Sequence, residues 1–223
     1  MVGTYVFDAY GTLFDVHAAI ARHRAAAGPD ADRCSEIWRT KQLEYTWTLT
    51  LAGRYVDFWT LTERALDYAL ARVPSVDSSL RRDFLDAYLR LQAFPDARTP
   101  LAELKGRGAR LAILSNGSPR MLSAATEAAG FAALLDAVLS VEAVRKYKPR
   151  PEVYALVSDR FGVRPENVTF VSSNRWDVMG AASFGFRPLW LNRARLPDEY
   201  ADFPPQRQIS DLGELSGVDA EGA

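Results

Sequence analysis

The sequence predicts an α/β fold, with a parallel β-sheet core and a helical cap inserted after the first strand. Two observations indicate this class. Short apolar, β-prone runs that end in polar or turn-forming residues alternate with helical stretches, which is typical of a parallel sheet with helices on both faces. Residues 15–94 interrupt this alternation with long helical patterns and no convincing strand. An all-helical insertion at that point most simply covers the ends of the strands.

Five short runs are the predicted strands, and four helical stretches alternate with the later ones. We expect strands at 5–7, 110–114, 137–139, 168–171 and 188–191, and helices at about 98–107, 119–129, 151–161 and 177–184. The chain then divides into a core domain (1–14 and 95–203), a cap domain (15–94) and a loosely ordered C-terminal tail (204–223).

The composition is that of a soluble globular protein, with 48% hydrophobic and 25% charged residues among 223. A formal net charge of -1 argues against a dedicated nucleic-acid binder, which would show a basic excess. One cysteine and two histidines argue against an internal disulfide and a Cys/His zinc cluster. The first residues do not resemble a signal peptide, and no window of ~18 residues is uniformly apolar. We therefore expect a cytoplasmic protein without a nucleic-acid or membrane partner.

Polar residues follow three of the predicted strands and locate a candidate site. Asp8 follows the first strand, Ser115 and Asn116 the second, and the segment 172–174 (Ser-Ser-Asn) the fourth. In parallel sheets, ligands bind beyond the carboxyl ends of the strands. A carboxylate placed like Asp8, before a tight turn with Gly11, can act as nucleophile, base or metal ligand. The alternative is an aspartate that caps the turn.

Four motifs resemble those of the haloacid dehalogenase superfamily in order and spacing. They are DAYGTLFD from residue 8, SNG from 115, KP from 148 and SSNRWD from 172. With the cap segment WRTKQLEYTW from residue 38, the set is similar to the L-2-haloacid dehalogenase branch. The resemblance covers the whole chain and implies a Rossmann-like core with a cap. It also implies a homodimer, with a small haloacid substrate and a halide product as partners.

The chain departs from the phosphatases of that superfamily at two positions. Those enzymes need a second aspartate two residues after the nucleophile, where this chain has Tyr10. They also need an acidic Mg²⁺ ligand at the start of the fourth motif, where Ser172, Ser173 and Asn174 leave only Asp177. We expect no metal or cofactor. The alternatives are a phosphatase or phosphonate hydrolase of the same fold, or a non-catalytic binding module.

The resemblance implies a two-step hydrolysis without metal. Asp8 displaces halide from C2 and inverts that carbon, leaving an ester on the enzyme. Water then attacks the aspartyl carbonyl and releases the D-2-hydroxy acid. Lys148 is expected to keep Asp8 ionised, although a lysine before a proline can also be simply solvated.

The remaining roles also follow from the matching positions. Asp177 would activate the water, although an aspartate in the first turn of a helix is also favoured by the helix dipole. Ser115 would bind the substrate carboxylate together with N–H groups near Tyr10 and Asn116, and Asn116 would also contact the halide. The supporting residues are Thr12, Ser172 and Asn174 around the nucleophile, with Tyr154 and Lys148 beside Asp177.

The cap contributes an arginine and part of an apolar wall. Arg39 shares a helix face with Leu43 and Trp47 at i, i+4 and i+8. Such an arginine either extends to solvent or meets an anion, and the resemblance favours halide stabilisation. Arg175 is expected to point to water. The expected wall around C2 consists of Tyr10, Leu43, Phe58 and Trp176.

Overall fold

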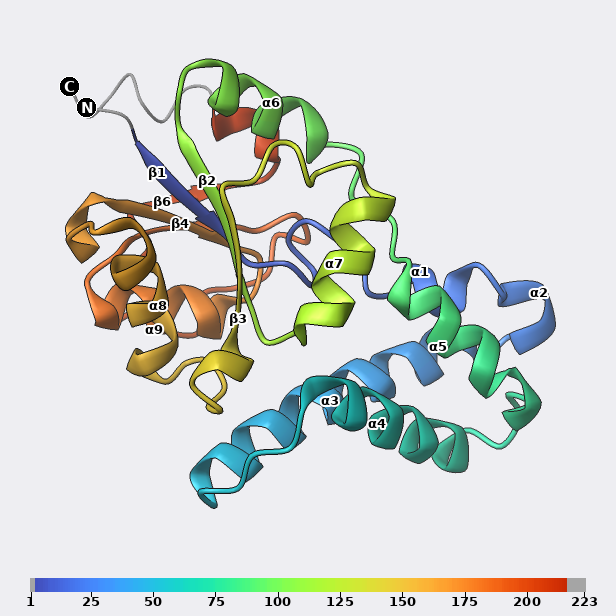
Figure 1. Ribbon diagram of the computed structural model, residues 1–223. Helices are drawn as coiled ribbons and strands as arrows, with labels where there is room; N and C mark the ends of the chain where they lie inside the picture. The colour runs from blue at the N-terminus through green and yellow to red at the C-terminus, as the bar shows by residue number, and fades with distance from the viewer. Residues whose placement is uncertain (1–2, 216–223) are drawn as a thin grey trace.

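A six-stranded parallel sheet forms the centre of the protein, as a computed structural model that describes residues 3–215 shows (Figure 1). Its strand order is β3-β2-β1-β4-β5-β6. The predicted α/β class is confirmed, and all five predicted strands are present. The strands are β1 (Thr4–Phe7), β2 (Arg110–Ser115), β3 (Ala137–Ser140), β4 (Val168–Ser172), β5 (Arg187–Leu191) and β6 (Arg207–Ile209).

The central strand β1 lies between β2 and β4, with Phe7 opposite Ile113 on one side and Val171 on the other. Every residue of β1 and of β4 is buried. This is expected of a parallel sheet covered on both faces, whose strands read as continuous apolar runs. Asp8 therefore leaves the sheet at its middle, between the ends of its two neighbouring strands.

Helices link the later strands and cover both faces of the sheet. Figure 1 shows α8 and α9 together on one face, with α6 and α7 on the other. Their ends follow local chemistry: the Ser118 hydroxyl caps α7, and Gly162 and Gly185 end α8 and α9 with positive φ. The bounds are α6 (Arg98–Gly106), α7 (Pro119–Ala128), α8 (Pro151–Phe161) and α9 (Arg175–Phe184). Short 3-10 turns span Ser78–Leu80, Val141–Ala143 and Pro165–Asn167.

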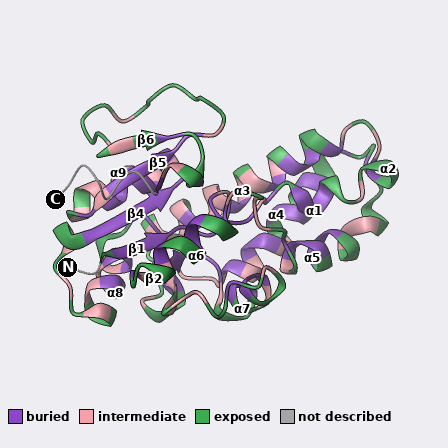
Figure 2. Cartoon of the chain, turned by 90° about the horizontal axis from the view of Figure 1, so that it is seen from above, coloured by how far each residue is buried: buried purple, intermediate pink, exposed green. Residues whose placement is uncertain are grey.

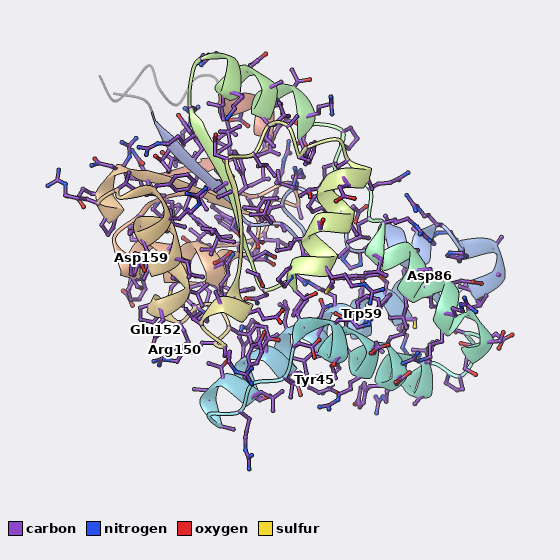
Figure 3. The ribbon with its side chains drawn as sticks, viewed as in Figure 1. Tyr45, Trp59, Asp86, Arg150, Glu152 and Asp159 are labelled. Carbon is purple, nitrogen blue, oxygen red and sulfur yellow. The ribbon has the colours of Figure 1, made fainter. Side chains whose placement is uncertain are left out.

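Five helices lie between β1 and α6, within residues 15–94, and are called the cap helices here. They are α1 (Ala18–Ala21), α2 (Arg24–Ala27), α3 (Ala31–Leu51), α4 (Phe58–Arg72) and α5 (Arg81–Leu89). The long helices α3 and α4, on which Figure 3 labels Tyr45 and Trp59, pack against each other. Their buried contact is partly polar, because the Trp38 indole donates to the Thr62 carbonyl at 2.8 Å.

The two connections between the sheet and the cap helices run side by side. Phe14 and Ala93 form an antiparallel bridge. The Asp15 N–H donates to the Gln92 carbonyl at 3.0 Å, and the Phe94 N–H donates to that of Leu13 at 2.9 Å. The helical insertion therefore begins and ends at neighbouring points, next to the loop that follows β1.

The C-terminal segment is more ordered than predicted. β6 pairs in parallel with β5, and Ile209, Leu212 and Leu215 are buried. The prediction of a loosely ordered tail from residue 204 is wrong up to residue 215, because these apolar side chains anchor a sixth strand on the sheet edge. Figure 2 shows the preceding loop, between β5 and β6, as a mostly exposed excursion. Residues 216–223 lie outside the described range.

Among the helices within residues 3–215, none combines the length and apolar character that would let it cross a membrane.

Candidate active site

Two carboxylates and one lysine form the centre of the site. The Lys148 Nζ atom lies 3.1 Å from Oδ1 of Asp8 and 2.7 Å from Oδ2 of Asp177. All three side chains are buried, and that of Lys148 is only 1% exposed. The residues come from three different segments: the end of β1, the loop before α8 and the first turn of α9. The sequence prediction that these three groups converge is consistent with this geometry.

Burial and charge act in opposite directions on this triad. Burial alone would lower the pKa of Lys148, but the Asp177 and Asp8 carboxylates outweigh it, so the pKa lies above its usual value. Burial raises the pKa of Asp177 to about 6, although the Lys148 ammonium opposes that rise. Lys148 therefore stays charged, whereas Asp177 can exchange a proton near neutral pH.

The second oxygen of Asp8 accepts three hydrogen bonds from neutral donors. Asn174 Nδ2 donates to Oδ2 at 2.7 Å, Thr12 Oγ1 at 3.2 Å and Ser172 Oγ at 3.4 Å. The Ser173 N–H in turn donates to Thr12 Oγ1 at 2.9 Å. These partners lie at or after the ends of β1 and β4, which are adjacent because the two strands pair. Asp8 is thus fixed in one orientation.

Tyr154 supports Asp177 from α8. Its hydroxyl donates to Oδ1 of Asp177 at 2.7 Å, and its side chain is fully buried. Burial, together with the Asp177 charge, raises the pKa of Tyr154 well above its usual value, so the phenol stays a neutral donor. Asp177 also lies in the first turn of α9, where the helix dipole favours a carboxylate. This position fits the helix-dipole reading of Asp177, and its activation of the water stays a prediction.

The ends of β2 and the start of α7 form a polar corner. The Gly117 N–H donates to Ser115 Oγ at 3.1 Å, and Asn116 Oδ1 accepts from the Lys148 N–H at 3.2 Å. Gly117 itself lies close to Tyr10, since a Cβ at this position would be 2.8 Å from Cε2 of that ring. N–H groups at the start of a helix favour an anion, which suits a substrate carboxylate.

Arg39 extends from α3 toward the core. Its NH1 donates to Gln42 Oε1 at 2.9 Å, and its NH2 donates to the Tyr10 carbonyl at 3.3 Å. The second contact directs the guanidinium at the loop after β1, so Arg39 does not extend freely to solvent. Further along α3, the Trp47 ring packs edge-on against Trp176, with centroids 5.4 Å apart.

A small cavity lies between these groups. Its volume is about 10 Å³, close to the minimum for one water molecule. The predicted residues Thr12, Lys148, Tyr154, Ser172 and Asp177 lie behind Asp8 rather than in the wall. The lining residues are Asp8, Tyr10, Arg39, Leu43, Phe58, Ser115, Asn116, Asn174 and Trp176.

A wider hollow of about 650 Å³ lies elsewhere, around the turn between α4 and α5. Its lining includes Asp67 and Arg81, which pair with each other, and exposed residues such as Pro74. We place the candidate site at the small cavity instead, because Asp8 lines it and contacts Lys148, which also pairs with the perturbed carboxylate Asp177.

Arg175 differs from the prediction that it points to water. Its side chain is 3% exposed and pairs with Asp198, Nε to Oδ1 at 2.7 Å. NH2 donates to the carbonyls of Tyr200 and Phe203 at 2.7 and 2.9 Å, and the Trp190 ring lies 5.6 Å away. The prediction is wrong because the loop between β5 and β6 folds back and surrounds the guanidinium.

Sequence reasoning missed two residues that support the site. Gln42 fixes Arg39, and its own Nε2 donates to Thr62 Oγ1 at 2.7 Å. Tyr147 donates to the Val56 carbonyl at 2.6 Å and so joins the loop before α8 to the connection between α3 and α4. Gln42 belongs to the segment WRTKQLEYTW and Tyr147 directly precedes the KP motif, but the sequence does not show that both side chains are buried.

Within residues 3–215, no group of three or more His, Cys, Asp or Glu side chains is arranged to hold a metal ion.

Comparison with known proteins identifies the family. A sequence profile described as haloacid dehalogenase-like hydrolase matches residues 2–185. The chain belongs to this family. (S)-2-haloacid dehalogenase 1 from Pseudomonas sp. (strain CBS-3) is 48% identical over 211 residues, covering 94% of this chain and 93% of that protein. (S)-2-haloacid dehalogenase 4A from Burkholderia cepacia is 46% identical, with coverage of 94% and 91%.

Solved structures agree with this assignment. The structure of L-2-haloacid dehalogenase from Xanthobacter autotrophicus with chloropropionic acid covalently bound has a TM-score of 0.91 and 39% sequence identity, and covers 100% of both chains. The similarity to this solved structure therefore extends over the cap helices as well as over the sheet.

Proposed function

We propose that this haloacid dehalogenase hydrolyses short L-2-haloalkanoic acids to D-2-hydroxy acids, with inversion at C2. The reaction proceeds through an ester on Asp8 and needs no metal. One observation carries the proposal. The Asp8 carboxylate and Arg39 line the same small cavity, and Lys148 and three neutral donors bind the two oxygens of Asp8. The relatives named for (S)-2-haloacid dehalogenation support the substrate class.

In the first step, an oxygen of Asp8 attacks C2 while the carbon–halogen bond breaks. The negative charge moves from the carboxylate to the departing halide. Arg39 and Asn116 line the same cavity as Asp8 and receive that charge, which stabilises the transition state. The side chains of Tyr10, Phe58 and Trp176 also line the cavity and limit water around the nucleophile.

In the second step, water attacks the carbonyl carbon of the aspartyl ester. Asp177 takes a proton from that water, because burial places its pKa at about 6 and it is ionised at neutral pH. The charge that develops on the carbonyl oxygen is held by hydrogen-bond donors already around Asp8, such as Asn174 and Thr12. The bond between the carbonyl carbon and the ester oxygen then breaks, the departing alkoxide takes the second proton of the attacking water, and Asp8 is regenerated as a carboxylate. Asp177 returns its proton to solvent.

The substrate carboxylate binds at the polar corner after β2. Ser115 Oγ and the N–H groups at Tyr10 and Asn116 supply the donors, and the start of α7 adds a favourable dipole. The cavity is close to the size of one water molecule, so short acids fit with the least rearrangement of the wall. A substrate whose carboxylate binds at this corner presents its C2 atom to Asp8.

The test is halide release from each enantiomer of 2-chloropropionate, with and without EDTA. We expect release from the L form alone, at a rate that EDTA does not change. Magnesium-dependent hydrolysis of a phosphate ester without halide release would show a phosphatase instead. The absence of activity toward haloacids, including fluoroacetate, and toward phosphate esters would contradict an enzyme of either kind.

Three further proposals concern organisation and setting. We infer that residues 1–14 and 95–203 act as a core domain, joined by the sheet residues up to 215, and that 15–94 act as the cap. We also infer a homodimer, as the resemblance implies, which light scattering on the purified protein tests. We further infer a cytoplasmic location, as the sequence predicts, and cell fractionation tests it.

A further inference from the structure

Arg193 lies just after β5 and joins two segments near the site. Its guanidinium pairs with Asp96, NH2 to Oδ1 at 2.8 Å and Nε to Oδ2 at 3.2 Å. NH2 also donates to the Thr12 carbonyl at 3.1 Å, and NH1 donates to that of Gly11 at 3.4 Å. The group lies 4.1 Å from the centre of the Phe94 ring. One side chain therefore holds the loop after β1 and the segment that leads from the cap helices to α6.

A short path of contacts connects Arg193 to Asp8. Thr12 is the link, because its carbonyl accepts from Arg193 while its hydroxyl donates to Asp8 Oδ2 at 3.2 Å. The turn itself is tightly shaped: Gly11 has a φ of 90°, and a Cβ there would lie 3.1 Å from Ser173 Oγ. Small shifts of this turn would therefore redirect the Thr12 hydroxyl.

Asp96, the ion-pair partner of Arg193, is also held by the surrounding chain. Besides the Arg193 guanidinium, Asp96 Oδ2 accepts a hydrogen bond from the Leu212 N–H at 3.1 Å. Phe94 is tied to the loop after β1 through its N–H, which donates to the Leu13 carbonyl. The side chains of Arg193 and Asp96 are only 24% and 16% exposed, so solvent screens this pair less than a surface pair.

We infer that Arg193 is a positioning residue for the nucleophile. It holds the Gly11–Thr12 turn so that the Thr12 hydroxyl stays on Asp8, and it takes its own support from Asp96. A guanidinium suits this task, because its planar fork binds a carboxylate with two N–H groups and still reaches two carbonyls; the single ammonium of a lysine cannot do both. The inference rests on the proposed function, in which Asp8 attacks C2.

The test compares Arg193→Ala and Arg193→Lys with wild type, using L-2-chloropropionate. We expect kcat of Arg193→Ala to fall by about 100-fold, as for a small misplacement of the reacting group. KM should stay close to the wild-type value, because Arg193 is absent from the cavity wall. Rapid-quench measurements should show slower ester formation, and Arg193→Lys should recover only part of the rate.

Arg81→Ala is the matched control, because it also removes an arginine from a pair with an aspartate, Asp67, on the surface of the cap helices. It should keep wild-type kcat. Added methylguanidinium should raise kcat of Arg193→Ala but not of Arg81→Ala, which a merely structural loss would not show.

A wild-type kcat per folded molecule in Arg193→Ala overturns the inference. If Arg193→Ala does not fold, the test uses Arg193→Lys. A native circular dichroism spectrum with slowed ester formation in that variant supports the positioning role, and ester formation at the wild-type rate overturns it. The wild-type halide assay comes first. Failure of that assay overturns the proposed function, whereas full activity in both wild type and the Arg193 variants overturns only the positioning role.

Discussion

Gly180 lies on α9, three residues after Asp177, and is closely covered by the residues behind the site. A Cβ added there would overlap the Tyr154 hydroxyl and would lie 2.6 Å from Pro149 Cβ. Tyr154 is fully buried, so its ring has little room to retreat. The substitution Gly180→Ala therefore tests the packing behind the site with a single methyl group.

Two effects of opposite sign compete in this variant. Alanine is better than glycine inside a helix by up to about 1 kcal/mol. Overpacking a filled core costs about 1–3 kcal/mol, and the overlap with Tyr154 and Pro149 leaves no neighbour free to yield. We expect the clash to win, with a net loss of about 1–2 kcal/mol in the free energy of unfolding. That loss corresponds to a fall in Tm of about 2–8 °C for a chain of this size.

The catalytic effect should be larger than the loss of stability suggests. Any retreat of Tyr154 weakens its hydrogen bond to Asp177 Oδ1, and a hydrogen bond to a charged group is worth about 1.5–3 kcal/mol. Ester hydrolysis should slow by about 10-fold or more, while ester formation at Asp8 changes less. Urea unfolding gives the first quantity, and rapid-quench kinetics separates the two chemical steps.

Gly106→Ala is the control. Gly106 ends α6, and a Cβ there meets no described atom within 4 Å. This variant should be neutral or stabilised by up to about 1 kcal/mol, with wild-type activity. The packing argument is refuted if Gly180→Ala is as stable and as active as wild type. It is also refuted if Gly106→Ala loses as much stability as Gly180→Ala.

Four other outcomes follow from the site. Asp8→Asn should abolish turnover, and full activity in protein shown by mass spectrometry to be undeamidated would refute the mechanism. Lys148→Met leaves two buried carboxylates without their cation and should cost about 3–5 kcal/mol in urea unfolding; a loss below about 1 kcal/mol contradicts this. Arg39→Ala should lower kcat about 100- to 1,000-fold with little change in stability, whereas the reverse result makes Arg39 structural. Because burial raises the pKa of Asp177 to about 6, protonation on the acid side removes the base, so single-turnover ester hydrolysis should decline as pH falls through 6; a flat rate down to pH ~4 would show an ordinary carboxylate.

The convergence of Asp8, Ser115 and Ser172 could be predicted from the sequence. Each residue follows a short apolar run, and the carboxyl ends of parallel strands meet at one edge. Lys148 and Arg39 required the resemblance as well, since neither lies at a strand end. Their side chains reach the site only through the folded paths of the loop before α8 and of α3.

The environment of Arg175 could not be predicted, because its partners are distant in sequence and lie in an irregular loop. Asp198 and the carbonyls of Tyr200 and Phe203 show no periodic pattern that marks them as neighbours. The strand β6 was not predicted from the sequence for a related reason. It is three residues long and pairs with β5 at the sheet edge, so it leaves little alternation to detect.

The central position of β1 bears on how the chain folds during synthesis. β1 lies between β2 and β4, which begin at Arg110 and Val168. The ribosome therefore releases both neighbours long after the strand itself, whereas α3 and α4 can pack as soon as they emerge. Such distant pairings form slowly and leave apolar surface exposed in the meantime. The strand before Asp8 consequently waits longer for its pairing partners during synthesis than α3 and α4 wait for each other.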